Sequence, residues 1–227
     1  MITYIPDVIT KDEVAQLNAV LATAEFADGA TTAGWHAREV KKNLQLTASM
    51  KGYDAPAKLV LAALERNALF QIAARPRFMM PILFNRYAVG MNYGAHIDDP
   101  IMAGPGPFPG RIRADVAFTL FLTDPTAYQG GELVVEQGGP EQRFKLPAGA
   151  MVVYPATSLH RVMPVTEGMR TSVVGWLQSE VRDPAKRQIL FDLDLVRRSL
   201  FGAEGKSRNF DLLSKAHANL LHLWAEM

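Results

Sequence analysis

Residues 85–98 read NRYAVGMNYGAHID, and this stretch ends in a histidine and an aspartate separated by one residue. On an extended strand, side chains i and i+2 point to the same side, so His96 and Asp98 can bind one cation while Ile97 faces away. Asp99 has the wrong register for that role. We therefore interpret this His-x-Asp pair as two ligands of an iron ion.

The region around this pair, from Phe78 onward, contains short apolar, β-branched or aromatic runs separated by glycine and proline. This texture predicts an all-β core, and the number of runs fits a double-sheet jelly roll or a partly closed barrel. We predict a mainly β fold with flanking helices (α+β). The expected strands span residues 80–87, 93–98, 115–123, 131–137, 142–146, 150–154, 159–165 and 170–178.

Helices are predicted on both sides of this core. Thr10 and Glu13 have the spacing of a capping box, and apolar residues at helical spacing follow them. The predicted helices span residues 10–26, 54–75, 183–202 and 209–227. We therefore expect one main domain at residues 1–178, with N-terminal helices at 1–77 and a jelly-roll core at 78–178, and a C-terminal helical extension at 179–227.

The apolar stripe of this extension must be covered by something. Packing on the first two helices would cover it, and so would a second subunit, which would make the protein a homo-oligomer through its C-terminal helices. The sequence leaves both arrangements open.

A third metal ligand is expected on a distant strand. His160 is the one histidine within a predicted strand of the later β region, whereas His36 lies in the N-terminal region. His217 and His222 lie five residues apart on a predicted helix and so do not share a face well. Two imidazoles and one carboxylate on one face of an octahedral cation leave positions open for a bidentate co-substrate and dioxygen.

Arg170 follows His160 by ten residues, and residues 164–169 between them resemble the turn of a hairpin. Such a hairpin would bring His160 close to Arg170 and Ser172, which share a face. A guanidinium binds a carboxylate through two charge-assisted hydrogen bonds, and a nearby hydroxyl can add a third. We therefore expect Arg170 and Ser172 to anchor the far carboxylate of a small dicarboxylic co-substrate.

Composition excludes several classes of protein. The 24 basic and 23 acidic residues give a net charge of +1, which provides no broad field for nucleic acid or an anionic membrane. The chain has no cysteine, so disulfides and thiolate ligands are excluded. The first residues lack the features of a secretory signal, and no apolar run approaches the roughly 20 residues that span a bilayer. We expect a soluble, cytoplasmic protein.

The connection at residues 100–110 is rich in proline and glycine and directly follows the His-x-Asp pair. A surface connector and a substrate-facing loop are both compatible with this position.

These residues resemble the iron(II)- and 2-oxoglutarate-dependent dioxygenases of the prolyl 4-hydroxylase-like branch, and most closely the bacterial PKHD-type hydroxylases. The ordered series that carries the resemblance covers nearly the whole chain and includes residues 85–98, 119–122, 128–133, 154–162 and 170–172.

The resemblance implies a double-stranded β-helix core with His96, Asp98 and His160 as iron ligands and Arg170 as the 2-oxoglutarate-binding residue. It also implies supporting roles for Tyr87 and Tyr93 near the co-substrate. Iron(II), 2-oxoglutarate and dioxygen would together hydroxylate a substrate and release succinate and carbon dioxide. Ascorbate would keep the iron reduced. Because halogenases of this type lack the carboxylate ligand, the presence of Asp98 implies oxygenation.

The resemblance does not specify the prime substrate, which is expected to be a peptidyl residue, an amino acid or a small metabolite. Trp176 lies on the Arg170 strand, where both a core position and a place in the cavity wall are open. Two other functions share the ligand set. A zinc hydrolase would use the same three ligands but has no use for an arginine anchor. A non-enzymatic β-barrel would bind the metal or a small ligand for sensing.

Overall fold

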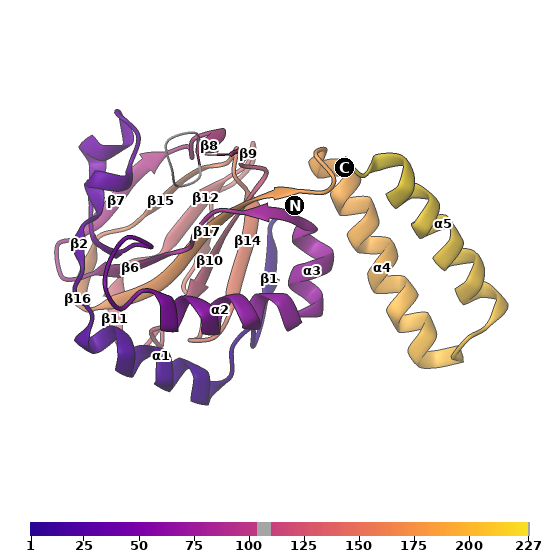
Figure 1. The fold of residues 1–227 in the computed structure, drawn as a ribbon, viewed down its shortest axis with the longest axis horizontal. Coiled ribbons are helices and arrows are strands. Elements are labelled where there is room, and N and C mark those ends of the chain that lie inside the picture. The colour runs from indigo at the N-terminus through magenta and orange to yellow at the C-terminus, as the bar shows by residue number, and fades with distance from the viewer. Residues whose placement is uncertain (104–109, 227) are drawn as a thin grey trace.

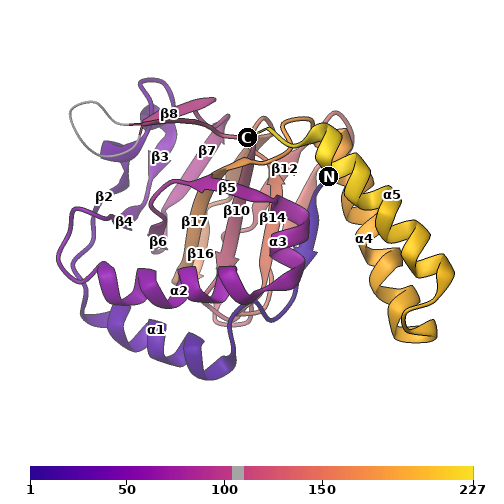
Figure 2. The ribbon, with the colours of Figure 1, turned by 45° about the vertical axis from the view of Figure 1, so that its right-hand side comes forward.

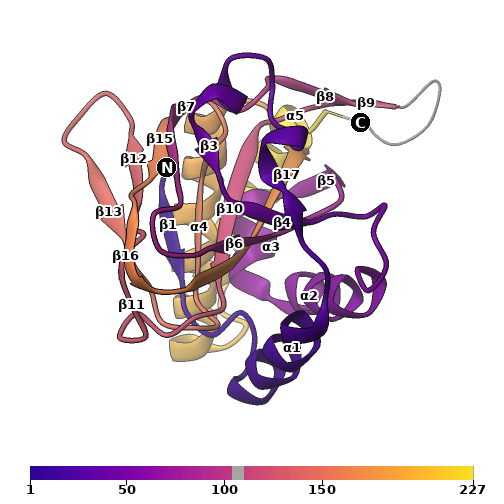
Figure 3. The same ribbon diagram turned by 90° about the vertical axis from the view of Figure 1, so that its left-hand side faces the viewer.

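The computed structural model describes residues 1–103 and 110–226. Two antiparallel sheets face each other, and three helices cover the outer side of the larger sheet (Figures 1 and 3). This arrangement is the expected jelly roll with flanking helices. The cavity between the two sheets is where the site residues lie.

The larger sheet runs in the order β1 (Thr3–Ile5), β14 (Met151–Pro155), β10 (Val116–Phe121), β17 (Arg170–Ser179), β6 (Leu83–Tyr87), β4 (Leu44–Leu46) and β2 (Ala27–Asp28), and β5 (Pro76–Met79) also pairs with β17. The smaller sheet runs in the order β13 (Gln142–Phe144), β12 (Leu133–Glu136), β15 (Leu159–Val162), β7 (Asn92–His96) and β3 (Lys41–Lys42). Two short ribbons complete the β structure: β8 (Ile101–Ala103) with β9 (Arg111–Arg113), and β11 (Tyr128–Gly130) with β16 (Val165–Gly168).

The central strands of the larger sheet are buried on both faces, which explains their continuous apolar runs. On β10, Phe118 and Leu120 belong to the cluster that packs against the helices, whereas Ala117 and Phe121 belong to the cluster between the sheets. Period-two alternation thus assigns neighbouring residues of one strand to two different cores.

The helices are α1 (Lys11–Thr23), α2 (Asp54–Arg66), α3 (Ala68–Ala74), α4 (Pro184–Glu204) and α5 (Arg208–Trp224), with 3₁₀ turns η1 (Gly29–Thr32) and η2 (Ala37–Val40). The predicted capping box of α1 is confirmed, because Thr10 and Glu13 each accept a hydrogen bond from the backbone N–H of the other. The second predicted helix is divided in two. Asn67 is extended, and its side chain accepts the N–H of Phe70 to start α3.

The C-terminal helices α4 and α5 form a helical hairpin that projects from the side of the β core (Figures 1 and 2). Phe191 of α4 packs with Ile72 and Ala73 of α3, and His217 of α5 hydrogen-bonds Arg75. The extension therefore packs on the second half of the second predicted helix. Within the described part of the chain, no helix has both the length and the apolar composition needed to cross a membrane.

Each predicted strand overlaps an observed strand, but the predicted hairpin at residues 164–169 is wrong. β15 lies in the smaller sheet and β17 in the larger, and residues 165–168 form β16, which pairs with β11. This pairing joins segments about 40 residues apart, so local turn signals could not reveal it. The predicted turn is instead a strand that crosses between the sheets.

Residues 1–77, where helices were the only regular elements predicted, also contribute strands to both sheets. β4 pairs with β6 of the larger sheet, and β3 pairs with β7 of the smaller one. In the proline- and glycine-rich connection, residues 101–103 and 111–113 pair as β8 and β9. Residues 104–109, on which the substrate-loop expectation mainly rested, lie outside the described residues.

Candidate metal centre and co-substrate cavity

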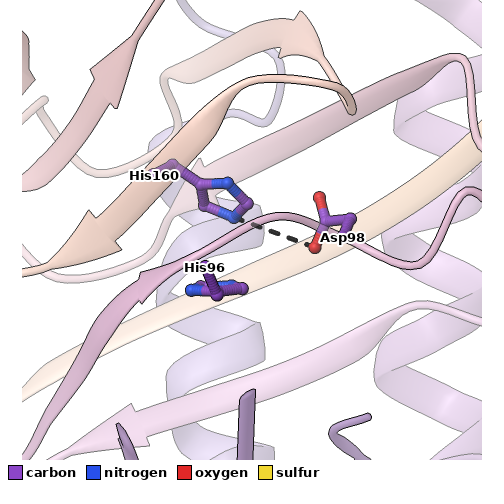
Figure 4. Close-up of side chains that lie close together, drawn as sticks. All are labelled: His96, Asp98 and His160. Atoms are coloured by element: carbon purple, nitrogen blue, oxygen red, sulfur yellow. Dashed lines mark ion pairs between the residues drawn. The ribbon is translucent and has the colours of Figure 1, made fainter. Parts of the chain in front are cut away.

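The three predicted metal ligands converge between the sheets (Figure 4). His96 and His160 are directly opposite each other on the neighbouring strands β7 and β15. Asp98 lies just beyond the end of β7, and the intervening Ile97 is 49% exposed, so the expected alternation persists past the strand. The ligand atoms of all three residues lie within 4.8 Å of one another, with 3.8 Å between His160 Nε2 and Asp98 Oδ1.

Backbone carbonyls orient both imidazoles. His96 Nδ1 is 2.8 Å from the carbonyl oxygen of Gly94, and His160 Nδ1 is 3.0 Å from that of Ser158. Because a carbonyl only accepts hydrogen bonds, each Nδ1 carries the proton and each Nε2 presents its lone pair. This second-sphere arrangement is typical of metal-binding histidines.

Burial and the neighbouring His160 lower the pKa of His96 to about 3, so its imidazole is neutral at physiological pH. Burial raises the pKa of Asp98, although His160 and Trp176 oppose this shift. Asp98 Oδ2 is buried and has no hydrogen-bond partner among the described residues. A buried oxygen without a partner and two inward-facing nitrogen lone pairs fit a divalent cation, and this donor set suits iron(II) with open coordination positions.

Arg170 begins β17 on the opposite sheet, and its side chain is 1% exposed. Its Nη1 donates a hydrogen bond of 2.8 Å to Ser172 Oγ, which confirms that the two residues share a face. Its Nε and Nη2 are buried without a partner among the described residues. A buried guanidinium with two nitrogens that lack acceptors has the chemistry needed to bind a carboxylate.

Gly131 makes room for this guanidinium. The backbone at Gly131 has φ +67°, and a Cβ there would lie 3.1 Å from Arg170 Cδ and 3.1 Å from Tyr128 Cε2. Gly130 and Gly131 both have positive φ, a backbone conformation that glycine adopts without strain. Gly131 has the further role of permitting close packing against Arg170.

The two predicted tyrosines lie at different places in the cavity. The Arg170 guanidinium lies 5.3 Å from the centre of the Tyr87 ring, and burial raises the pKa of Tyr87 to about 12, so its hydroxyl stays protonated. Tyr93 instead stacks on His96, with 3.5 Å between ring centroids. Tyr87 therefore lies beside the Arg170 guanidinium, and Tyr93 lies beside His96.

One cavity of about 670 Å³ connects the metal cluster with Arg170. Trp176 lines it, so this residue is part of the cavity wall. Lys41, Gln45 and Asn85 are among the polar lining residues that sequence reasoning did not single out. Lys41 and Gln45 lie at alternating positions of the β3–β4 segment. A polar residue at such a position can face either solvent or a polar cavity, and the sequence pattern is the same in both cases.

The other histidines are not part of this site. His36 and His222 are exposed, and His217 is in the C-terminal helical hairpin.

Comparisons with known proteins agree with this geometry. The model of the 2OG-Fe(II) oxygenase superfamily matches residues 82–178. A PKHD-type hydroxylase of Synechococcus sp. (strain JA-2-3B'a(2-13)) is 50% identical over 227 residues, which cover 100% of both chains. A PKHD-type hydroxylase of Synechococcus elongatus is 52% identical over 217 residues, covering 94% of this chain and 96% of the relative.

Solved structures show the same fold at low sequence identity. A 2OG-Fe(II) oxygenase family oxidoreductase from Burkholderia pseudomallei aligns with a TM-score of 0.58 and 21% identity, covering 78% of this chain and 85% of that one. A Pseudomonas putida prolyl-4-hydroxylase aligns with a TM-score of 0.52 and 19% identity, covering 78% and 92%.

A jelly roll with a His-Asp-His cluster facing a buried arginine defines the class of iron(II)- and 2-oxoglutarate-dependent oxygenases. The similarity to a PKHD-type hydroxylase extends over the full length of the chain. The chain belongs to the 2OG-Fe(II) oxygenase superfamily, among the PKHD-type hydroxylases. Its family chemistry uses Fe²⁺, 2-oxoglutarate and dioxygen, so the hydrolase and non-enzymatic alternatives are set aside.

Proposed function

We propose that His96, Asp98 and His160 bind the iron(II) and that Arg170, supported by Ser172, binds the distal carboxylate of 2-oxoglutarate. The observation that carries this assignment is that one cavity contains two groups of buried polar atoms without hydrogen-bond partners. Asp98 Oδ2 lacks a partner at one place, and the Arg170 Nε and Nη2 groups lack partners at another. A cation at the first place and a carboxylate at the second satisfy both.

Iron bound there supplies dioxygen activation coupled to the conversion of 2-oxoglutarate into succinate and carbon dioxide. The chain's own residues position the reactants. Backbone carbonyls orient the histidines, and the guanidinium fixes one end of the co-substrate. Tyr93 supports the metal side by stacking on His96, and Tyr87 supports the co-substrate side through its ring beneath Arg170. The substrate to be hydroxylated is a peptidyl residue, an amino acid or a small metabolite.

Anaerobic titration with iron(II) and 2-oxoglutarate tests the assignment. Wild-type protein should develop a weak visible charge-transfer band and, in air, form succinate. His96→Ala and His160→Ala should lose both signals because each removes one of three ligands. His222→Ala is the matched control, since His222 is an exposed residue of α5 and not a member of the cluster. An undiminished band in His160→Ala would exclude the proposed ligand set.

We propose residues 1–178 as the catalytic domain and residues 179–227 as an appended helical unit. The described cavity lining supports this division, because it contains no residue beyond Trp176. Limited proteolysis should separate the two units at the exposed residues 182–185, and metal binding should survive the cut.

We propose a homo-oligomer formed through the C-terminal helices. Large apolar side chains on α4 and α5 support it: Val196 is 56% exposed, Phe201 52% and Leu223 73%. Light scattering should show a mass above that of the 25.0 kDa chain, and Val196→Glu should reduce it. A monomeric wild type would contradict this assembly.

We also propose a cytoplasmic location and reactivation by ascorbate. Cytoplasmic metabolism supplies 2-oxoglutarate, and a reductant restores iron that oxidises during uncoupled turnover. Cell fractionation tests the first statement, and succinate yield with and without ascorbate tests the second.

A further inference from the structure

Lys41 is a second buried cation of the cavity. It lies on β3, directly opposite Tyr93 of β7, and is 7% exposed. Among the described lining residues, Lys41 and Arg170 are the only lysine and arginine. No ion pair within 4.0 Å includes Lys41 in the part of the chain that the structure describes.

The contacts of Lys41 within the protein are neutral. Its Nζ donates a hydrogen bond of 3.0 Å to Thr32 Oγ1 and lies 5.0 Å from the centre of the Tyr93 ring. An ammonium has three donors, so a single hydroxyl acceptor leaves it incompletely satisfied. A ring face compensates a buried cation only in part.

The charge of Lys41 is therefore costly to bury. Burial lowers the pKa of Lys41 to about 8, which still leaves most of the side chains protonated at neutral pH. The acidic groups that act on it are Asp98 and Asp28. A metal ion bound to Asp98 would compensate the charge of this carboxylate. Asp98 would then stabilise the Lys41 ammonium less than it does in the metal-free protein.

A chain of hydrogen bonds fixes Thr32 and therefore the position of the ammonium. Thr32 Oγ1 donates to Gln45 Oε1 at 2.5 Å, and Gln45 Nε2 donates to Asn85 Oδ1 at 2.6 Å. Thr32, Gln45 and Asn85 are hydrogen-bonded to one another. The remaining N–H groups of the Lys41 ammonium are therefore the donors that this wall of the cavity can present to a ligand.

We propose that Lys41 binds a carboxylate of the prime substrate, so that the substrate is a small carboxylic acid or the C-terminal residue of a peptide. This inference rests on the proposed function, in which Arg170 is already used by 2-oxoglutarate. A single cation suits a monoanion, and Asp99, exposed in the same cavity lining, disfavours a dianion such as phosphate. A cavity of about 670 Å³ is large enough for a small acid beside the co-substrate.

Binding experiments on protein loaded with zinc(II) and saturating 2-oxoglutarate test this proposal without turnover. Saturating 2-oxoglutarate blocks Arg170, so a second carboxylate has to bind elsewhere. The probes are N-acetylated amino acids, tripeptides ending in the same residues, the carboxamide of each, and inorganic phosphate. Saturation-transfer NMR and calorimetry measure their dissociation constants, and the free acids and tripeptides distinguish the two sources of the carboxylate.

We expect acids to bind about 10- to 100-fold more tightly than their carboxamides, as for a hydrogen bond to a charged group. Lys41→Met should abolish this preference, and Lys41→Arg should retain part of it. Lys42→Met is the matched control, because Lys42 is the next residue of the same strand and is exposed. Melting by circular dichroism establishes that Lys41→Met is folded; Lys41→Gln, which keeps a hydrogen-bonding group, replaces it otherwise.

Equal binding of acids and carboxamides, no binding of any acid probe, or an unchanged preference in Lys41→Met would overturn the role of Lys41. Preferential binding of phosphate would overturn it too. Failure of the proposed function gives a different result, because wild-type protein would then not bind 2-oxoglutarate in the presence of the metal.

Discussion

Replacement of Arg170 by methionine tests the link between the two halves of the site. Methionine keeps an unbranched apolar stem but removes the guanidinium, whose Nε and Nη2 have no partner within the described residues. Two charge-assisted hydrogen bonds to a carboxylate, at about 1.5–3 kcal/mol each, imply a loss of about 3 kcal/mol or more. The dissociation constant of 2-oxoglutarate should therefore rise roughly 100-fold or more.

The same substitution should not destabilise the ligand-free protein strongly. Each unsatisfied buried donor costs about 1–3 kcal/mol, and methionine removes two of them together with the hydrogen bond to Ser172. The melting temperature without ligand should stay the same or rise. In wild type, 2-oxoglutarate at 100 times its dissociation constant should add about 2.7 kcal/mol, and Arg170→Met should lose this gain.

Calorimetry on cobalt(II)-loaded protein measures the affinity, and melting curves with and without 2-oxoglutarate measure the stability. Arg170→Lys should have an intermediate affinity because it retains the charge but not the planar fork. Arg143→Met is the control, since Arg143 is an exposed arginine on β13. Normal 2-oxoglutarate affinity in Arg170→Met, or a loss of several kcal/mol in the ligand-free protein, would show that Arg170 is a structural residue and refute the reasoning.

Three further predictions concern stability, each measured by urea unfolding. Gly131→Ala should cost about 1–3 kcal/mol and weaken 2-oxoglutarate binding, because its Cβ would lie 3.1 Å from Arg170 Cδ at a φ of +67°. Gly138→Ala, with φ +69° and no atom within 4 Å, should show only the backbone cost of about 1 kcal/mol and normal binding. The pKa of His96 in the folded protein is about 3, below its ordinary value of 6.5. Between pH 6.5 and pH 3, His96 therefore binds a proton in the unfolded chain but not in the folded protein. Stability of the metal-free protein should fall as the pH drops from 6.5 toward 3, and His96→Gln should show a shallower fall; equal slopes would contradict the assigned burial. Thr10→Ala should cost about 1 kcal/mol, since it removes the hydroxyl that accepts the Glu13 N–H, and an unchanged midpoint would argue against the cap.

The local features of this chain were readable from the sequence because they depend on near neighbours. The capping box of α1 needs only the spacing of Thr10 and Glu13. The inward direction of His96 and Asp98 needs only the two-residue period of extended backbone. His160 was predicted as the third ligand because it is the one histidine in a later predicted strand and because the family resemblance implies it, and the structure places it beside His96 and Asp98.

The tertiary structure decided what depends on strand pairing between distant segments. The sequence predicted a hairpin at residues 164–169, but β16 instead pairs with β11, so His160 and Arg170 lie on different sheets of the larger fold. Lys41 illustrates the same limit. Only its pairing with Tyr93 across β3 and β7 places a lysine that reads as solvent-facing inside the cavity. The sequence by itself thus determined which side chains form the candidate metal cluster. Hydrogen bonding between strands that are distant in sequence determined that Lys41 and Arg170 line the same cavity.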